Sequence, residues 1–269
     1  MRQAISFVLL LLLFSVFGNS VAFSVPQSKT YQKTRKILSA MDDVRNDHDK
    51  LAALFSVGDE RIQDLILALD DPDTDISLRA QIVIRYLGSA KGMKSLIEWY
   101  NKRPNGHPIA GPIPLPLTEW DYQFIDSNLI SRSPDTWKEI GVQYIYALAI
   151  DDADRSKRTL DAIVKNAGSV NENTFVGKAL QQIQTGRPKR LIAVERDLAR
   201  EVLENAFFIS AKDHKHATAH LLGLDGKKDK ALVELYINRG RLSQEWYHVV
   251  MSKCGQGWSF FSITQVAIS

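Results

Sequence analysis

The chain has 269 residues, of which 45% are hydrophobic and 24% are charged, and its formal net charge at pH 7 is +3. This size suits one large domain or two modest ones. The nearly balanced charge argues against nucleic acid as the main partner, because phosphate binding needs a concentrated basic surface. The single cysteine, Cys254, excludes an intramolecular disulfide, so the fold must rest on its apolar core.

The first 22 residues have the order of charged, apolar and small-residue regions that is typical of a cleavable secretory signal peptide. Arg2 precedes an apolar run from Ala4 to Phe17. The small residues Ser20 and Ala22 occupy the two positions before the expected cleavage site that a signal peptidase recognises. The run is shorter than the roughly 20 residues that span a membrane, and an uncleaved anchor helix is the alternative. We expect a secreted or periplasmic protein with no integral membrane segment after cleavage.

Residues 23–58 predict a polar lead, which extends to Lys36, and then a first helix. Residues 59–209 predict a helical-repeat domain, because apolar residues recur at the spacing of an amphipathic helix, first at Ile62, Leu65, Ile66 and Leu69. The turn at residues 70–73 ends this helix, since its proline disfavours helix at the preceding residue. A second helix runs to Gly88, a natural C-terminal cap.

Residues 65–88 resemble a HEAT-repeat unit, with the sequence LILALDDPDTDISLRAQIVIRYLG. The matching features are the Asp-Pro turn between paired helices, Arg79-Ala80 early in the second helix and Leu87-Gly88 at its end. HEAT and armadillo-like proteins are helical solenoids that mostly bind other proteins. The resemblance therefore implies a helical array and a protein partner, and a lone helix pair needs neighbours to bury its apolar face.

Five prolines interrupt the helical pattern in a Pro-rich loop at residues 104–118. This loop is expected to be extended and stiff, with its apolar residues packed against the helices. Further helices are predicted near residues 137–148, 154–164 and 175–183. A long last helix is predicted from Arg190 to Phe208, with its apolar residues facing inward, namely Ile192, Leu198, Val202, Leu203 and Phe207.

Residues 210–269 predict an antiparallel β module, because β-branched and aromatic residues dominate and turn residues recur at regular intervals. The expected strands are 216–224, 230–238, 245–253 and 258–268. The fold class is therefore α+β, an irregular HEAT-like helical array followed by a four-stranded antiparallel β meander. A last helix followed by a curved sheet is similar in element order to nuclear-transport-factor-2-like and cystatin-like modules, and this likeness implies no site residues.

His214, His216 and His220 are the candidate metal ligands, because on one extended strand all three would face the same way. Three imidazoles can bind zinc, and Asp213 could serve as a fourth ligand or as an outer partner. The spacing matches no established metal motif, and polar histidines at the entry of an edge strand are ordinary. The favoured prediction is a chain without a cofactor, and zinc is the alternative.

The candidate partner-binding residues are aromatic residues of the β module: Tyr236, Trp246 and Trp258. Large side chains occupy both faces of the last strands, so one face either packs internally or offers apolar surface to a partner. The sequence contains no nucleophile elbow, metalloprotease, phosphate-loop or dinucleotide motif, so no catalytic residue is nominated and an enzyme is disfavoured.

The preferred function is therefore an exported non-enzymatic scaffold that binds another protein. The alternative is a metal- or small-molecule-dependent site around the histidine cluster at residues 213–220, and hydrolysis is one activity that such a site could have.

Overall fold

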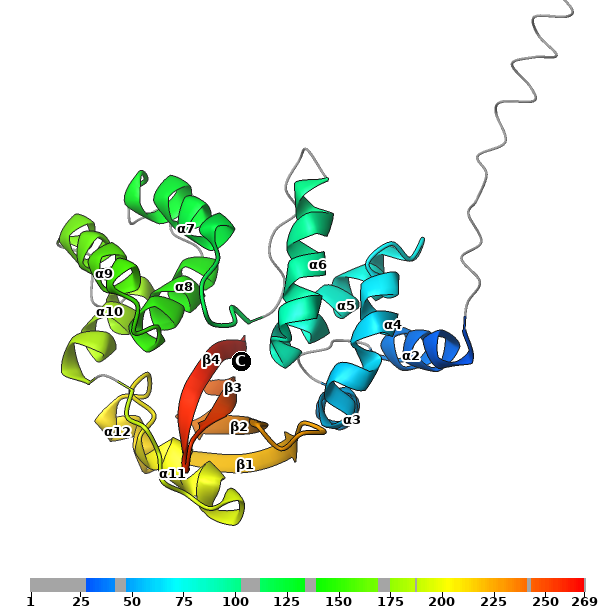
Figure 1. Ribbon diagram of the computed structural model, residues 1–269. Helices are drawn as coiled ribbons and strands as arrows, with labels where there is room; N and C mark the ends of the chain where they lie inside the picture. The colour runs from blue at the N-terminus through cyan, green and yellow to red at the C-terminus, as the bar shows by residue number, and fades with distance from the viewer. Residues whose placement is uncertain are drawn as a thin grey trace, which may run out of the picture.

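The computed structural model describes residues 28–41, 47–102, 112–133, 139–168, 175–186, 188–240 and 243–268. Helices come first and a four-stranded antiparallel sheet follows them, so the α+β class is confirmed (Figure 1). The predicted signal peptide lies outside the described residues, as does the part of the Pro-rich loop before residue 112.

The first helical group precedes the Pro-rich loop and comprises α2 (Lys29–Ser39), α3 (His48–Val57), the short 3₁₀ segment η1 (Gly58–Arg61), α4 (Ile62–Ala68), α5 (Thr74–Leu87) and α6 (Ala90–Asn101). The predicted helix pair is present as α4 and α5, and Gly88 ends α5 in the left-handed conformation with φ of 56°. The polar lead was expected to extend to Lys36, but α2 begins at Lys29. The relation of the α4–α5 pair to the HEAT family stays a prediction.

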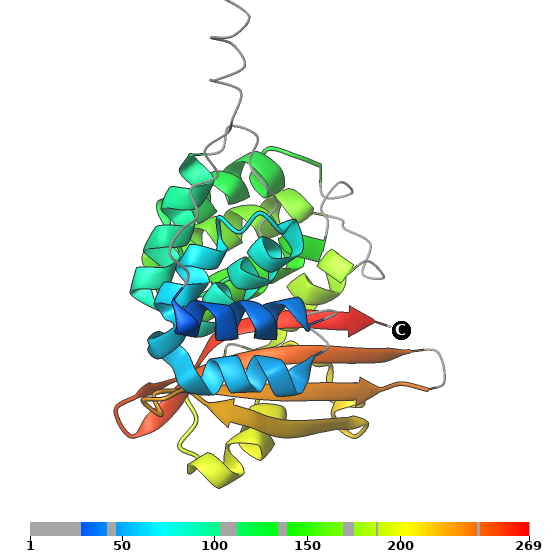
Figure 2. The ribbon, with the colours of Figure 1, turned by 90° about the vertical axis from the view of Figure 1, so that its right-hand side faces the viewer.

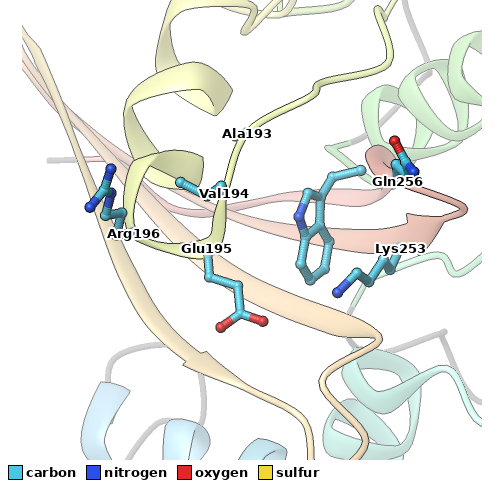
Figure 3. A pocket seen from close by; sticks show the side chains of 7 residues that line it. Ala193, Val194, Glu195, Arg196, Lys253 and Gln256 are labelled. Atoms are coloured by element: carbon cyan, nitrogen blue, oxygen red, sulfur yellow. The ribbon is translucent and has the colours of Figure 1, made fainter.

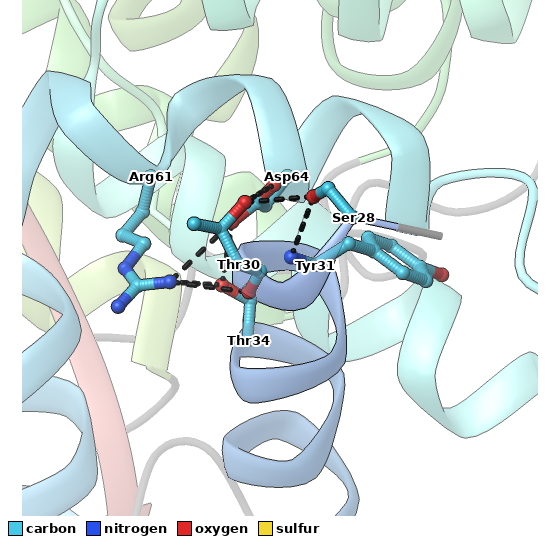
Figure 4. A network of polar contacts seen from close by, with 6 residues as sticks. All are labelled: Ser28, Thr30, Tyr31, Thr34, Arg61 and Asp64. Carbon is cyan, nitrogen blue, oxygen red and sulfur yellow. Dashed lines mark hydrogen bonds and ion pairs between the residues drawn. The ribbon is translucent and has the colours of Figure 1, made fainter. Parts of the chain in front are cut away.

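Polar contacts dock α2, a helix of low apolar content, on α4 and on the turn that follows α4. The buried carboxylate of Asp64 accepts hydrogen bonds from Thr34 at 3.0 Å and Thr30 at 3.3 Å (Figure 4). The hydroxyl of Tyr31 donates to Asp71 at 2.6 Å. Since buried carboxylates need such partners, these tertiary contacts compensate for the low apolar content of α2.

The second helical group follows the Pro-rich loop and comprises α7 (Glu119–Ile125), the π-helical turn η2 (Asp126–Ile130), α8 (Glu139–Ile150), α9 (Asp154–Ala167), α10 (Phe175–Thr185), the 3₁₀ turn η4 (Glu195–Asp197), α11 (Leu198–Glu204) and α12 (Ala211–His214). The described end of the loop, residues 112–118, is not helical, as expected. Thr118 and Asp121 then form a capping box that starts α7.

The prediction of one long helix from Arg190 to Phe208 is wrong. Only η4 and α11 are helical in this stretch, and Ile192, which was expected to face inward, is 81% exposed. The reason is tertiary: the backbone of Leu191 pairs with that of Trp258 in the sheet. Those hydrogen bonds hold the chain extended before α11. The helical spacing of the apolar residues in this stretch gives no sign of this distant pairing.

The sheet is a meander in the order β1-β2-β3-β4, with every neighbouring pair antiparallel. Its strands are β1 (Ala217–Leu224), β2 (Lys230–Asn238), β3 (Gln244–Cys254) and β4 (Gly257–Ile268), so each predicted strand end is correct to within one residue. Register shifts interrupt the β1–β2 and β3–β4 ladders. Such bulges bend and twist strands, in keeping with the strong curvature in Figure 1.

The sheet lies between the two helical groups and takes part in both apolar cores. Leu232 and Val250 pack with the first helical group, whereas Val233 and Val249 pack with the second. Figure 2 shows α2 and α3 running along the strands in front of one face. Alternate side chains of a strand point to opposite faces, which is how one strand serves two cores. The domain boundary expected at residue 210 stays a prediction, but the two cores meet in this shared sheet.

Candidate functional site

A row of four polar residues crosses the sheet on the face toward the first helical group. His220 of β1 is opposite Glu234 of β2, Glu234 is opposite His248 of β3, and His248 is opposite Thr264 of β4. Directly opposed residues of an antiparallel sheet point to the same face with their Cβ atoms about 5 Å apart. Glu234 is only 9% exposed and His248 is 0% exposed, so this row places polar groups inside a largely apolar layer.

Two helices of the first group supply polar side chains to this row. His48, the first residue of α3, places its Nδ1 atom 2.8 Å from Oε2 of Glu234. The hydroxyl of Tyr86 in α5 lies 2.7 Å from Nδ1 of His248. The rings of His48 and His248 meet edge to face, with their centroids 5.2 Å apart. The preceding residue, Asp47, caps α3 through the amide of Lys50 and thereby helps to fix where the helix begins.

The surroundings set different charge states on the two buried members of the row. The contact with His48 lowers the pKa of Glu234 below its ordinary value, and this outweighs the burial that raises it. Burial, together with the nearby charge of His48, lowers the pKa of His248 to about 3. At neutral pH the cluster therefore contains an ionised carboxylate beside a neutral imidazole.

His48, Glu234 and His248 are the residues best placed to hold a metal ion in the described part of the chain. Each offers one ligand atom, and these atoms lie within 4.8 Å of one another. Three buried atoms in the row have no hydrogen-bond partner among the described residues: Glu234 Oε2, His248 Nε2 and Thr264 Oγ1. The short contact between His48 and Glu234 is an ion pair when His48 is protonated.

The sequence contained a partial signal for this cluster. Polar residues at 234 and 248 interrupt otherwise apolar strands at matching distances from the intervening turn, so a hairpin register would have paired them. Nothing in the spacing of the sequence connects either residue to His48, which comes from a helix far earlier in the chain. Only the packing of α3 on the sheet brings that residue to them.

The predicted metal ligands are not on one strand, and that expectation is wrong. His214 ends α12, with its Nε2 atom 3.1 Å from the carbonyl oxygen of Ile209, and His216 lies in the turn that follows. Asp213 is buried and forms an ion pair with Arg239 at 3.0 Å. Helix α12 continues to His214, so strand geometry does not align these side chains. Only His220, beside Glu234 in the polar row, is in the first described strand.

A surface hollow of about 550 Å³ lies where the chain before α11 meets the turn between β3 and β4 (Figure 3). Trp258 forms part of its wall and is itself buried, and the ammonium group of Lys253 is 5.6 Å from the centroid of the Trp258 ring. The remaining lining residues are Ala193, Val194, Glu195, Arg196 and Gln256. The hollow therefore combines an aromatic wall with charged edges.

An extended segment, residues 191–194, borders this hollow at the edge of β4. The amide of Leu191 donates to the carbonyl of Trp258 at 2.8 Å, and the reverse bond is 2.7 Å long. A Cβ atom on Gly257 would lie 2.6 Å from the Leu191 oxygen, so only glycine permits this approach. Burial alternates along the segment: Leu191 and Ala193 are buried, whereas Ile192 is 81% and Val194 is 56% exposed.

Of the predicted partner-binding residues, only Trp258 lines the hollow. Tyr236 and Trp246 are opposite each other on β2 and β3, on the face of the polar row, with their ring centroids 5.0 Å apart. Both are partly buried. Trp258 therefore lies apart from Tyr236 and Trp246. A role of these three residues in partner binding stays a prediction.

Comparison with known proteins found no matching family model, curated protein or solved structure. Within the ranges that the structure describes, no helix is long and apolar enough to cross a membrane.

Proposed function

We propose that the chain is an exported non-enzymatic scaffold that binds an extended, acidic segment of another protein at the hollow beside Trp258. The observation that carries this proposal is the pair of exposed β-branched side chains, Ile192 and Val194, on an extended segment at the edge of the sheet. Large apolar side chains exposed together at the border of a hollow are typical of interaction sites. The order of regions in residues 1–22 supports export to a secreted or periplasmic location.

The backbone of the segment favours an extended partner. Both backbone groups of Leu191 bond to Trp258, and successive residues of an extended chain direct these groups to alternate sides. The N–H and C=O groups of Ile192 therefore face away from β4. A partner strand can hydrogen-bond there and place alternate side chains against Val194 and the wall of the hollow, which is the mode called β-augmentation.

The charges around the hollow favour acidic side chains in the partner. Lys253 and Arg196 line the hollow, and Arg190 lies close against Gly257 in the adjoining turn. Glu195 is the one carboxylate among the lining residues. A carboxylate that approaches Lys253 beside the buried Trp258 ring is partly removed from water, which strengthens its attraction to the cation.

The test uses two synthetic peptides, one alternating valine with aspartate and the other alternating valine with lysine. Binding is followed by fluorescence polarisation of the labelled peptide at low and high salt. We expect saturable binding of the acidic peptide alone, which weakens at high salt. An Ile192→Ser/Val194→Ser variant should weaken binding at least about tenfold, because each buried β-branched side chain contributes about 1.5–3 kcal/mol.

Leu78→Ser is the matched control, because Leu78 is a 44% exposed apolar side chain on α5 and does not line the hollow. It should leave the affinity unchanged. Equal binding of both peptides, or an equal loss in the control and the double variant, contradicts the proposal.

A further inference from the structure

We propose that His48, Glu234 and His248 bind one divalent transition-metal ion, such as Zn²⁺, between helix α3 and the sheet. This inference is independent of the partner site beside Trp258. It rests on ligand atoms that converge from three separate elements and lie within 4.8 Å of one another. These are also the residue types that such ions prefer, since imidazole suits zinc, copper, iron and nickel, and a carboxylate completes many of their sites.

The first argument is the unpartnered nitrogen of His248. This side chain is 0% exposed, and its Nε2 atom has no hydrogen-bond partner in the described ranges. Oε2 of Glu234 is 3.9 Å away, which is too far for a hydrogen bond. A buried polar atom without a partner destabilises the fold, so its position beside a carboxylate points to a ligand that satisfies both.

The second argument is the tautomer of His248. The Tyr86 hydroxyl and Nδ1 of His248 are 2.7 Å apart, and either can be the donor; in the tautomer whose Nδ1–H group donates to the oxygen of Tyr86, the lone pair of Nε2 faces the Glu234 carboxylate. Two electron-rich atoms then face each other inside the protein, an arrangement that a cation between them stabilises. A histidine that binds a metal through one nitrogen and hydrogen-bonds through the other is the usual form of such ligands. Tyr86 is thus a positioning residue.

The distances fit an ion only after the side chains move, because the three donor atoms lie within 4.8 Å of one another and the most distant of them must draw closer. Tetrahedral zinc at about 2.0–2.2 Å from each donor atom separates the donors by about 3.3–3.6 Å. The contacts of Glu234 Oε2 are 2.8 Å to His48 Nδ1 and 3.9 Å to His248 Nε2, one shorter and one longer than this range. The side chain of His48 is 30% exposed, so it has room to move outward and gives an ion a route from solvent.

Protonation of His48 would explain its contact with Glu234 but not the unpartnered nitrogen of His248. Protonated His48 pairs with ionised Glu234 but leaves Nε2 of His248 unsatisfied. An ion engages all three side chains at once. His220 is the next imidazole along the row and lies opposite Glu234 on the same face, whereas His214 and His216 lie outside the strand. This contrast supplies a matched control from the same chain.

The experiment begins with the full protein after removal of metals by a chelator. Zn²⁺ is titrated by calorimetry, and Co²⁺ is titrated by visible absorption, which reports the coordination geometry directly. We expect one ion per chain. His48→Ala and Glu234→Gln should each weaken Zn²⁺ binding at least about 100-fold, because loss of an outer partner alone costs 10–100-fold. Tyr86→Phe should weaken binding by about 10–100-fold and retain the cobalt spectrum.

The control is the His214→Ala/His216→Ala double variant, which should bind Zn²⁺ as the wild type does. Circular dichroism of each metal-free variant establishes that it is folded before titration. His48→Ala changes a partly exposed residue and Glu234→Gln conserves volume, so at least one folded ligand variant is expected. Absence of Zn²⁺ binding by the wild type, or equal affinity in a folded His48→Ala variant, overturns the proposal. So does a loss of binding confined to the double variant.

Discussion

Acidification of the metal-free protein should destabilise it through His248. Burial lowers the pKa of this fully buried imidazole to about 3, whereas an unfolded histidine titrates near pH 6.5. The unfolded chain therefore binds more protons than the folded one between these values. Because the folded pKa is depressed, the contribution of His248 to stability is complete above about pH 6.5 and is lost as the pH falls toward 3.

The size of the effect follows from the two pKa values. At pH 5 the unfolded histidine is almost fully protonated and the folded one is neutral, so linkage gives a loss of about 2 kcal/mol relative to neutral pH. At pH 4 the loss is about 3 kcal/mol. The pKa of Glu234 is lowered by its contact with His48, so the stability from this carboxylate is lost only at more acidic pH. The interval from pH 7 to pH 5 therefore separates the effect of His248 from that of Glu234.

The assay is urea unfolding at pH 7 and pH 5 in the presence of a chelator, followed by circular dichroism. We compare the wild type with His248→Gln, which keeps a polar side chain near Tyr86 but does not titrate. The wild type should lose about 2 kcal/mol more than the variant between the two pH values. His216→Gln, a change at an exposed turn residue, should behave like the wild type. Equal losses in the wild type and in His248→Gln would refute the reasoning.

Three further substitutions test contacts between segments that are distant in the sequence. Gly88→Ala should lower stability by about 2–4 kcal/mol in thermal melts, because it strains a left-handed cap and its Cβ would lie 2.5 Å from the Phe261 ring; an unchanged melt contradicts that packing. Gly257→Ala should abolish hydrogen-exchange protection of the Leu191 amide, since its Cβ would lie 2.6 Å from the Leu191 oxygen; retained protection contradicts the pairing. Tyr31→Phe removes a hydroxyl that donates to a buried carboxylate and should cost about 1–2 kcal/mol in urea unfolding, whereas no loss would mean that this hydrogen bond contributes nothing.

The elements that the sequence predicted correctly are those with a strong local signal. The stripe that begins at Ile62, the proline turn after it and the cap at Gly88 together predicted α4 and α5. Alternation and turn residues likewise predicted all four strands and their meander order. These signals depend on periods of 3.6 and two residues and on the backbone preferences of proline and glycine, so they need no knowledge of distant parts of the chain.

Two of the errors have the opposite character, because each of them depends on a contact between distant segments. The apolar residues near Ile192 have helical spacing, but the backbone bonds of Leu191 to β4 decide their conformation. Polar α2 is helical where the sequence predicted a lead, since buried carboxylates of the α4–α5 region hold it.

The candidate metal site also combines residues paired by local sequence patterns with residues that only tertiary packing brings in. The strand period and the turn between β2 and β3 carry enough information to pair Glu234 with His248, although neither residue is among the predicted ligands His214, His216 and His220. Only the tertiary structure decided that α3 brings His48 to Glu234 and that α5 brings Tyr86 to His248. The packing of a helix on a sheet depends on the complementarity of two whole surfaces, and no local period in the sequence encodes which helical residue faces which strand.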